Sequence, residues 1–331
     1  MQKKISLEDK ILVAGSRGMV GSAITRLLKK KGYGKNNGKI YTPSRKELNY
    51  LNLIEVENWF EKFNPNIVII SAAKVGGILA NSSQQADFIL ENLKIQTNLI
   101  ETAWRFGVKR LLFLGSSCIY PKYSKQPIKE EYLLEGYLEK TNESYAIAKI
   151  SGIKLCEALR SQYGFDAISL MPTNLYGTGD NYHPINSHVM PSLIRKFCLA
   201  KEQCLSSITC WGSGNVLREF LHVDDLASAA LFSLEKWDPE KDSFSISESG
   251  EKLYFLNVGT GKDISIKDLA KKIAHATNYS GDIYWDKSKP DGTPRKLLNI
   301  EKILKLGWKP NISLEDGINQ TIKEFKNKVN Y

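Results

Sequence analysis

The first 170 residues of the chain alternate short apolar runs with longer amphipathic stretches. The runs, rich in Ile, Leu and Val, predict buried strands at 11–14, 40–42, 67–71, 111–115 and 167–171. The stretches between them have helical period, at 20–31, 53–63, 86–106 and 145–163. Strands that are apolar throughout and separated by helices are typical of a parallel sheet covered on both faces. Because such crossovers are right-handed, the pattern predicts a doubly wound, Rossmann-like α/β fold.

The strict alternation ends near residue 172. Two segments beyond it, 172–191 and 287–294, are rich in Pro, Gly, Asn and His. They are interleaved with predicted helices at 190–201 and 225–234. We therefore expect a first domain over 1–172, to which parts of 205–260 return. A smaller C-terminal α/β lobe over 173–331 would bind the substrate above the carboxyl ends of the strands. The polar segment 237–252 is expected to be a surface loop.

Composition excludes several classes of protein. No run of about 18 apolar residues is present, and the apolar stretch 11–14 is too short for a signal peptide, so we expect a cytoplasmic protein with no membrane partner. The five cysteines include no C-x-x-C pair, which predicts neither a disulfide framework nor a metal site. The net charge of +10 is scattered along the chain, which favours an anionic small molecule over nucleic acid as the partner.

A glycine-rich loop lies between the first predicted strand and the first predicted helix. Its residues are Gly15, Ser16, Arg17, Gly18, Met19, Val20 and Gly21. Glycines at three-residue spacing permit a tight turn and a close approach of backbone to a pyrophosphate, which the free N–H groups of the helix N-terminus can bind. The loop predicts a dinucleotide cofactor.

The second strand indicates which dinucleotide is bound. NAD sites usually carry an acid at the end of this strand, but here Glu47 follows only after Arg45 and Lys46. Arg17 and Arg45 could clamp a 2′-phosphate, although both could also be solvated surface side chains. The sequence favours NADP(H), so the domain over 1–172 is expected to bind it.

Tyr145 and Lys149 are four residues apart in a predicted helix, on one face and about one turn apart. An ammonium near the phenol would lower its pKa, so that the tyrosine can act as a general acid or base. Ser116 ends the fourth strand, where a doubly wound sheet presents ligand-binding side chains. We expect Ser116, Tyr145 and Lys149 to meet beside the cofactor.

Several segments together resemble the GDP-L-fucose synthases, a family of extended short-chain dehydrogenases/reductases also described as GDP-4-keto-6-deoxy-D-mannose 3,5-epimerase-4-reductases. They are residues 71–77, 114–121, 145–149, 171–177, 186–188, 211–214, 218–225 and 289–296, and the similarity runs from about residue 10 to 320. The resemblance implies GDP-4-keto-6-deoxy-D-mannose as substrate. It also implies a homodimer formed through the helices at 86–106 and 145–163.

The resemblance implies two steps in one pocket. A cysteine and a histidine, here Cys118 and His188, exchange the protons at C3 and C5 that the neighbouring carbonyl acidifies. NADPH then reduces C4, with Tyr145 protonating the oxygen, Ser116 orienting it and Lys149 holding the tyrosine and the nicotinamide ribose. Without the resemblance, Cys118 could be an inert buried thiol and His188 a brace of its loop.

The remaining site residues are also implied by the resemblance. Beyond the glycine loop and Arg45, the cofactor would contact Ala72, Leu114, Gly115, Ser116, Ser117, Tyr145, Lys149, Pro172, Thr173, Asn174, Leu175 and His188. The diphosphate and base of the substrate would be held by Lys196, Trp211, Arg218, Asp291 and Lys296. Arg218 could instead form a structural ion pair with Asp224.

Other readings of the same motifs stay open. No residue in the sequence distinguishes this chain from a related epimerase/reductase that acts on a GDP-linked heptose or dideoxy sugar. An NAD-dependent nucleotide-sugar 4-epimerase is disfavoured by Arg17 and Arg45, and a 4,6-dehydratase would need an Asp-Glu pair at Ser117-Cys118. A non-catalytic NADP(H)-sensing regulator would be expected to lack Tyr145 or Lys149.

Overall fold

The computed structural model describes residues 3–184, 186–289 and 291–328. The segments 172–191 and 289–296 discussed above contain Ile185 and Pro290, which lie outside the described residues, as do the outermost ends of the ranges 1–172 and 173–331.

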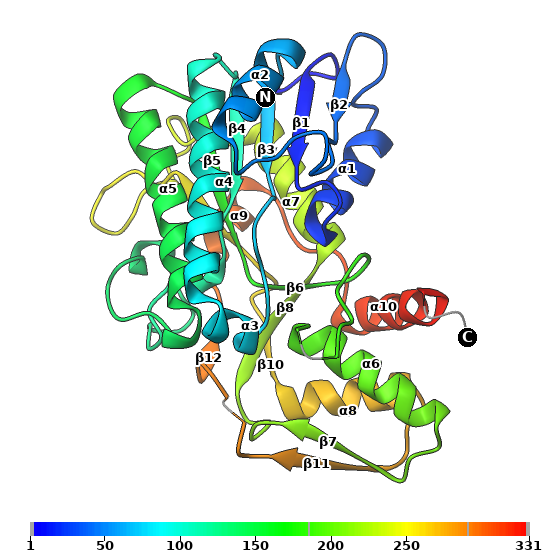
Figure 1. Ribbon diagram of the computed structural model, residues 1–331. Coiled ribbons are helices and arrows are strands. Elements are labelled where there is room, and N and C mark those ends of the chain that lie inside the picture. The colour runs from blue at the N-terminus through cyan, green and yellow to red at the C-terminus, as the bar shows by residue number, and fades with distance from the viewer. Residues whose placement is uncertain (1–2, 185, 290, 329–331) are drawn as a thin grey trace.

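A six-stranded parallel sheet forms the larger unit, in the order β2-β1-β3-β4-β5-β9 (Figure 1). Its strands are β1 (Lys10–Ala14), β2 (Lys39–Tyr41), β3 (Ile67–Ile70), β4 (Arg110–Leu114), β5 (Ala167–Pro172) and β9 (Phe255–Val258). Helices α2 (Leu53–Phe63), α4 (Gln85–Arg105) and α5 (Glu143–Tyr163) cover one face, and α1 (Met19–Lys30) and α7 (Val223–Lys236) cover the other. The doubly wound, Rossmann-like α/β fold is confirmed.

The strand order places a crevice at the glycine loop. After β1 the chain crosses to the edge strand β2 and returns to β3 on the opposite side of β1. The connections that leave β1 and β3 therefore diverge, and ligands bind outside the carboxyl ends of such strands. The predicted strands and helices of the first 170 residues agree with the observed ones to within two residues at each end.

The smaller unit lies beyond the carboxyl ends of these strands (Figure 1). Strands β6 (Asn174–Tyr176), β8 (Leu217–His222), β10 (Asp263–Ser265) and β12 (Arg295–Lys296) pair together, and β7 (Ser207–Trp211) pairs with β11 (Asp282–Asp286). Helices α6 (Val189–Glu202), α8 (Ile266–Ala276) and α10 (Leu314–Lys328) enclose a second apolar core. The short helices α3 (Ile78–Ser83) and α9 (Glu301–Leu306) complete the α-helices of the described residues. Because β9 and α7 belong to the large unit, the C-terminal half of the chain builds both units.

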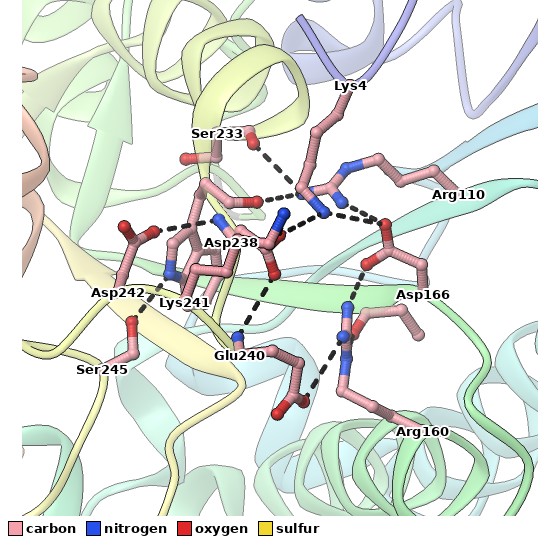
Figure 2. A network of polar contacts seen from close by, with 12 residues as sticks. Lys4, Arg110, Arg160, Asp166, Ser233, Asp238, Glu240, Lys241, Asp242 and Ser245 are labelled. Atoms are coloured by element: carbon pink, nitrogen blue, oxygen red, sulfur yellow. Dashed lines mark hydrogen bonds and ion pairs between the residues drawn. The ribbon is translucent and has the colours of Figure 1, made fainter. Parts of the chain in front are cut away.

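A buried polar network ties the amino ends of β4 and β5 to the segment after α7 (Figure 2). The guanidinium of Arg110, 1% exposed, pairs with Asp166 and donates to the carbonyl of Trp237 at 2.6 Å. Arg160 pairs with the same carboxylate. Buried charges are tolerated only when paired and hydrogen-bonded, as they are here.

The expectation of a surface loop at 237–252 is wrong for four of its residues, because Trp237, Pro239, Ser245 and Ser247 are buried. Trp237 and Ser245 are fully buried, and the indole N–H donates to the Ser245 hydroxyl at 2.8 Å. The segment is polar partly because it supplies acceptors and ion-pair partners to this network (Figure 2).

Replacing Asp166 with Ala removes the carboxylate that Arg110 and Arg160 share. We expect the free energy of unfolding, measured by urea denaturation, to fall by about 3–5 kcal/mol, because a buried guanidinium loses its partner. Lys241→Met is the control, since Lys241 is an exposed partner of Asp238, and should cost less than about 1 kcal/mol. Similar losses in the two variants would contradict this account.

Candidate active site

One cavity of about 1180 Å³ lies over the carboxyl ends of the large sheet and is lined by both units. Every site residue expected from the sequence lines it, from Gly15 after β1 to Lys296 in β12. Among the described residues no cluster of three His, Cys, Asp or Glu side chains could hold a metal ion.

The glycine loop forms one wall of the cavity. Gly15 has a positive φ of 85°, and a Cβ there would lie 2.6 Å from the backbone nitrogen of Ala72. A Cβ on Gly21 would lie 2.2 Å from the carbonyl oxygen of Gly15. The hydroxyl of Ser16 is buried and has no hydrogen-bond partner in the described part of the chain. This cradle and the uncapped start of α1 fit a pyrophosphate.

The end of the cavity near β2 fits a 2′-phosphate. Arg17 and Arg45 line it with exposed side chains. Glu47 instead accepts the N–H of Ser44 at 2.7 Å, within its own turn, and does not line the cavity. The acid that could have bound a ribose 2′-OH is thus used locally, and two cations remain at this end.

Ser116, Tyr145 and Lys149 meet at the carboxyl end of β4. The ammonium of Lys149 donates to the carbonyl of Leu114 at 2.8 Å and lies 5.8 Å from the Tyr145 ring centroid. Burial lowers the pKa of Lys149 to about 7. The hydroxyl of Ser116 accepts the backbone N–H of Cys118 at 3.2 Å, and its interaction with Tyr145 acts to lower the pKa of the phenol.

The expected lowering of the Tyr145 pKa is wrong for this geometry. Burial and the nearby Cys118 raise its pKa, and only the hydrogen bond with Ser116 opposes them. Lys149 is bonded to a carbonyl and does not offset these effects. In this geometry Tyr145 therefore keeps its proton, and it is a weaker acid than a free phenol.

Cys118 follows β4 in a short 3-10 turn, Ser117–Ile119. Its sulfur accepts hydrogen bonds from the amide of Asn142 at 3.2 Å and the ammonium of Lys296 at 3.6 Å. Burial raises the pKa of Cys118, but the charge of Lys296, hydrogen bonds with Ser116 and Lys296, and the charge of Arg218 together lower it below the ordinary value. Cys156 shows the contrast, since burial raises its pKa to about 12. Cys118 is the reactive thiol of the pair.

His188 is the N-terminal cap residue of α6 and lines the same cavity. Its imidazole makes no capping hydrogen bond to the helix. His188 is exposed toward the cavity, and the protein that surrounds the ring lowers its pKa by desolvation. His183, by contrast, accepts the N–H of Asn186 at 3.1 Å and so braces this loop.

The outer end of the cavity carries Trp211, which is 54% exposed, and Lys196, which donates to the carbonyl of Thr209. Arg218 donates to the carbonyl of Asp291 at 3.1 Å, and the carboxylate of Asp291 accepts the N–H of Ser213 at 2.8 Å. These bonds hold the turn after β7.

The alternative of an Arg218–Asp224 ion pair is wrong, because Asp224 pairs with Arg26 at 2.8 Å.

Asn142 is a residue of the site that the sequence analysis missed. It stands three residues before Tyr145, a spacing that places both on one side of a helix start and could have found it.

Comparison with known proteins identifies the family of the chain. Residues 11–247 match the model of the NAD dependent epimerase/dehydratase family. The chain is 51% identical to GDP-L-fucose synthase 1 of Arabidopsis thaliana, over 97% of this chain and 94% of the relative. It is 48% identical to the GDP-L-fucose synthase of Escherichia coli (strain K12), over 96% and 97%.

Solved structures agree as well. A GDP-6-OMe-4-keto-L-xylo-heptose reductase from C. jejuni superposes with a TM-score of 0.91 at 36% identity, covering 98% of this chain and 99% of that one. An NADP-bound GDP-L-fucose synthetase from Naegleria fowleri superposes with a TM-score of 0.84 at 27% identity, covering 99% and 97%. The chain belongs to the NAD dependent epimerase/dehydratase family and, within it, to the GDP-L-fucose synthases.

Proposed function

We propose that this chain epimerises GDP-4-keto-6-deoxy-D-mannose at C3 and C5 and reduces C4 with NADPH, giving GDP-L-fucose. The observation that carries the proposal is the placement of Cys118, with a cation at its sulfur, in one cavity with His188 and the Ser116–Tyr145–Lys149 set. A simple reductase needs only the last three. The relatives named GDP-L-fucose synthase support the choice of sugar.

The carbonyl at C4 acidifies the hydrogens on both neighbouring carbons. When a base removes one of them, the electron pair of the C–H bond moves to the carbonyl oxygen, and hydrogen bonds from Ser116 and Tyr145 stabilise the enolate. A proton delivered to the opposite face of the carbon inverts it. Cys118 and His188 are the two groups that exchange these protons, because a thiolate and an imidazole are both effective near neutral pH.

Reduction uses the same carbonyl. NADPH supplies the hydride for C4 when it is bound. Tyr145 gives its phenolic proton to the oxygen, because the alkoxide that hydride addition forms at C4 is a stronger base than a phenolate. Lys149 lies 5.8 Å from the Tyr145 ring centroid and ties this face of α5 to the end of β4 through the carbonyl of Leu114. Removing the ketone in this step also draws the epimerisation forward.

A second candidate keeps the chemistry and changes the sugar. The reductase from C. jejuni, with a TM-score of 0.91, acts by its name on a GDP-linked heptose. A relative 37% identical over 97% of this chain is a GDP-L-colitose synthase from Yersinia pseudotuberculosis. Turnover of a GDP-4-keto-heptose faster than that of the 6-deoxy sugar would favour this alternative.

Incubation with GDP-4-keto-6-deoxy-D-mannose and NADPH in heavy water tests both steps. We expect NADPH oxidation, with deuterium at C3 and C5 of the product. Cys118→Ser should slow labelling by about 10²–10⁴-fold. Tyr145→Phe should slow reduction by a similar factor, while deuterium still enters the unreduced ketone. NADPH oxidation without label at these carbons would remove the epimerase half.

The choice of cofactor is tested at its phosphate end. Arg17→Ala and Arg45→Ala should each raise the KM for NADPH roughly 10- to 100-fold, because a charged hydrogen bond to the 2′-phosphate is lost. The KM for NADH should change little, since NADH lacks that phosphate. An equal rise in the KM for NADPH and for NADH would mean that the two arginines do not bind the 2′-phosphate.

We further propose that the chain is a homodimer that pairs through α4 and α5 in a four-helix bundle. These neighbouring helices carry exposed apolar side chains, among them Leu90, Ile147 and Tyr163. Light scattering is expected to give about twice the chain mass of 37.3 kDa; a monomer would refute the pairing.

None of the described helices could cross a membrane. We also propose that the enzyme acts in the cytoplasm.

A further inference from the structure

Two side chains at the sulfur of Cys118 have no part in the steps derived above. Asn142 was not expected in the site at all, and Lys296 was expected at the nucleotide diphosphate. We propose that Lys296 and Asn142 form a cradle that keeps Cys118 as a thiolate, with Lys296 acting on the sulfur as a positioning residue. Only the use of this thiolate as the epimerisation base rests on the proposed function.

The sulfur is surrounded by hydrogen-bond donors. The Asn142 amide lies 3.2 Å and the Lys296 ammonium 3.6 Å from Sγ. Ser116, at the end of β4, accepts the backbone N–H of Cys118 at 3.2 Å and so holds the turn that carries the sulfur. A neutral thiol is a weak donor that needs an acceptor, whereas a thiolate accepts from several donors at once. The arrangement therefore matches the anion.

Strand β12 holds Lys296 in place, although it is only two residues long. Lys296 is paired in register with Arg218 of β8. On one side, Arg295 pairs with Asp263 at 2.6 Å. On the other, the N–H of Leu297 donates to Gln126 at 2.9 Å. Within the described residues Lys296 forms no ion pair with a carboxylate, so its charge is available to the sulfur.

The charged and titratable groups that act on Cys118 come from three elements. Lys296 on β12 and Arg218 on β8 are positive and favour the thiolate. Tyr145 on α5 is neutral, and its pKa is raised further by Cys118. Glu139, an acid near Arg218, is neutralised by Lys122 at 2.8 Å. The balance at the sulfur is positive, and removing Lys296 removes its largest part.

This charge pattern links the two halves of the reaction. A thiolate beside Tyr145 disfavours a phenolate, so the phenol keeps its proton. The resting site therefore presents a base for the ring carbons and an acid for the C4 oxygen together. Neither group has to exchange a proton with water before the cycle starts.

Alkylation of the thiol tests the cradle without substrate or cofactor. Iodoacetamide reacts with the thiolate, so the rate at Cys118, followed by peptide mass spectrometry against pH, reports its pKa; the exposed Cys204 is an internal reference. Lys296→Met should slow alkylation at pH 7 by about 10-fold or more and move the midpoint to higher pH. Lys296→Arg keeps the charge and should keep most of the rate.

Two further variants complete the test. Asn142→Ala, from a different element, should slow alkylation by roughly 5-fold, as expected for one hydrogen bond. Lys262→Met, an exposed lysine outside the cavity, changes the net charge equally and should leave the midpoint unchanged. An unchanged midpoint of the alkylation profile in Lys296→Met, with a raised KM for the nucleotide sugar instead, would overturn the proposal. Lys296 would then be a residue that binds the diphosphate of the substrate.

The outcome is separable from that of the proposed function. A shifted midpoint without deuterium at C3 and C5 would leave the cradle standing and remove the epimerase. Deuterium incorporation at C3 and C5 with an unshifted midpoint in Lys296→Met would support the epimerase and refute the cradle. Equal circular dichroism spectra of the variants ensure that the comparison is between folded proteins.

Discussion

The two units of the chain are joined by one buried carboxylate. Glu219 of β8 has no exposed surface, and its oxygens accept the N–H groups of Thr260 at 2.6 Å, Gly261 at 2.7 Å and Leu298 at 3.0 Å. Its own carbonyl accepts the amide of Asn174 at 2.8 Å. A carboxylate is stable in such a place only because its oxygens are hydrogen-bonded. Glu219 thereby fixes β8 and the segment after β12 against the segments that follow β5 and β9, beside the cavity.

The two units supply different parts of the chemistry. The sheet provides the glycine cradle, the serine hydroxyl and the helix that carries Tyr145 and Lys149. The lobe provides positive charge, from Arg218 and Lys296, and the imidazole of His188. Because the reactive sulfur comes from the sheet and its cation from the lobe, neither unit alone builds an activated cysteine.

Periodicity predicted five of the six strands of the large sheet, because they are rich in apolar residues and separated by helices. The sixth, β9, lies in the segment 205–260 that was expected only to return to the sheet. The glycine loop and the Tyr145–Lys149 pair were also predictable, since their chemistry depends on local spacing. Contacts between distant segments were not: the approach of Lys296 to Cys118 depends on how β12 pairs with β8. The rise in the pKa of Tyr145 depends on burial, and the burial of Trp237 on a network whose members are far apart in sequence. Neither quantity is encoded in a short motif.

The distance along the chain between Cys118 and Lys296 bears on the order of synthesis. The two are 178 residues apart, so at usual ribosomal rates the lysine emerges on the order of ten to forty seconds after the cysteine. Throughout that interval the nascent chain carries Cys118 without its cation, as an ordinary thiol that oxidants attack slowly. The raised reactivity would appear only when the C-terminal strand docks, so a chain released too early would hold a sulfur no more reactive than an ordinary exposed thiol.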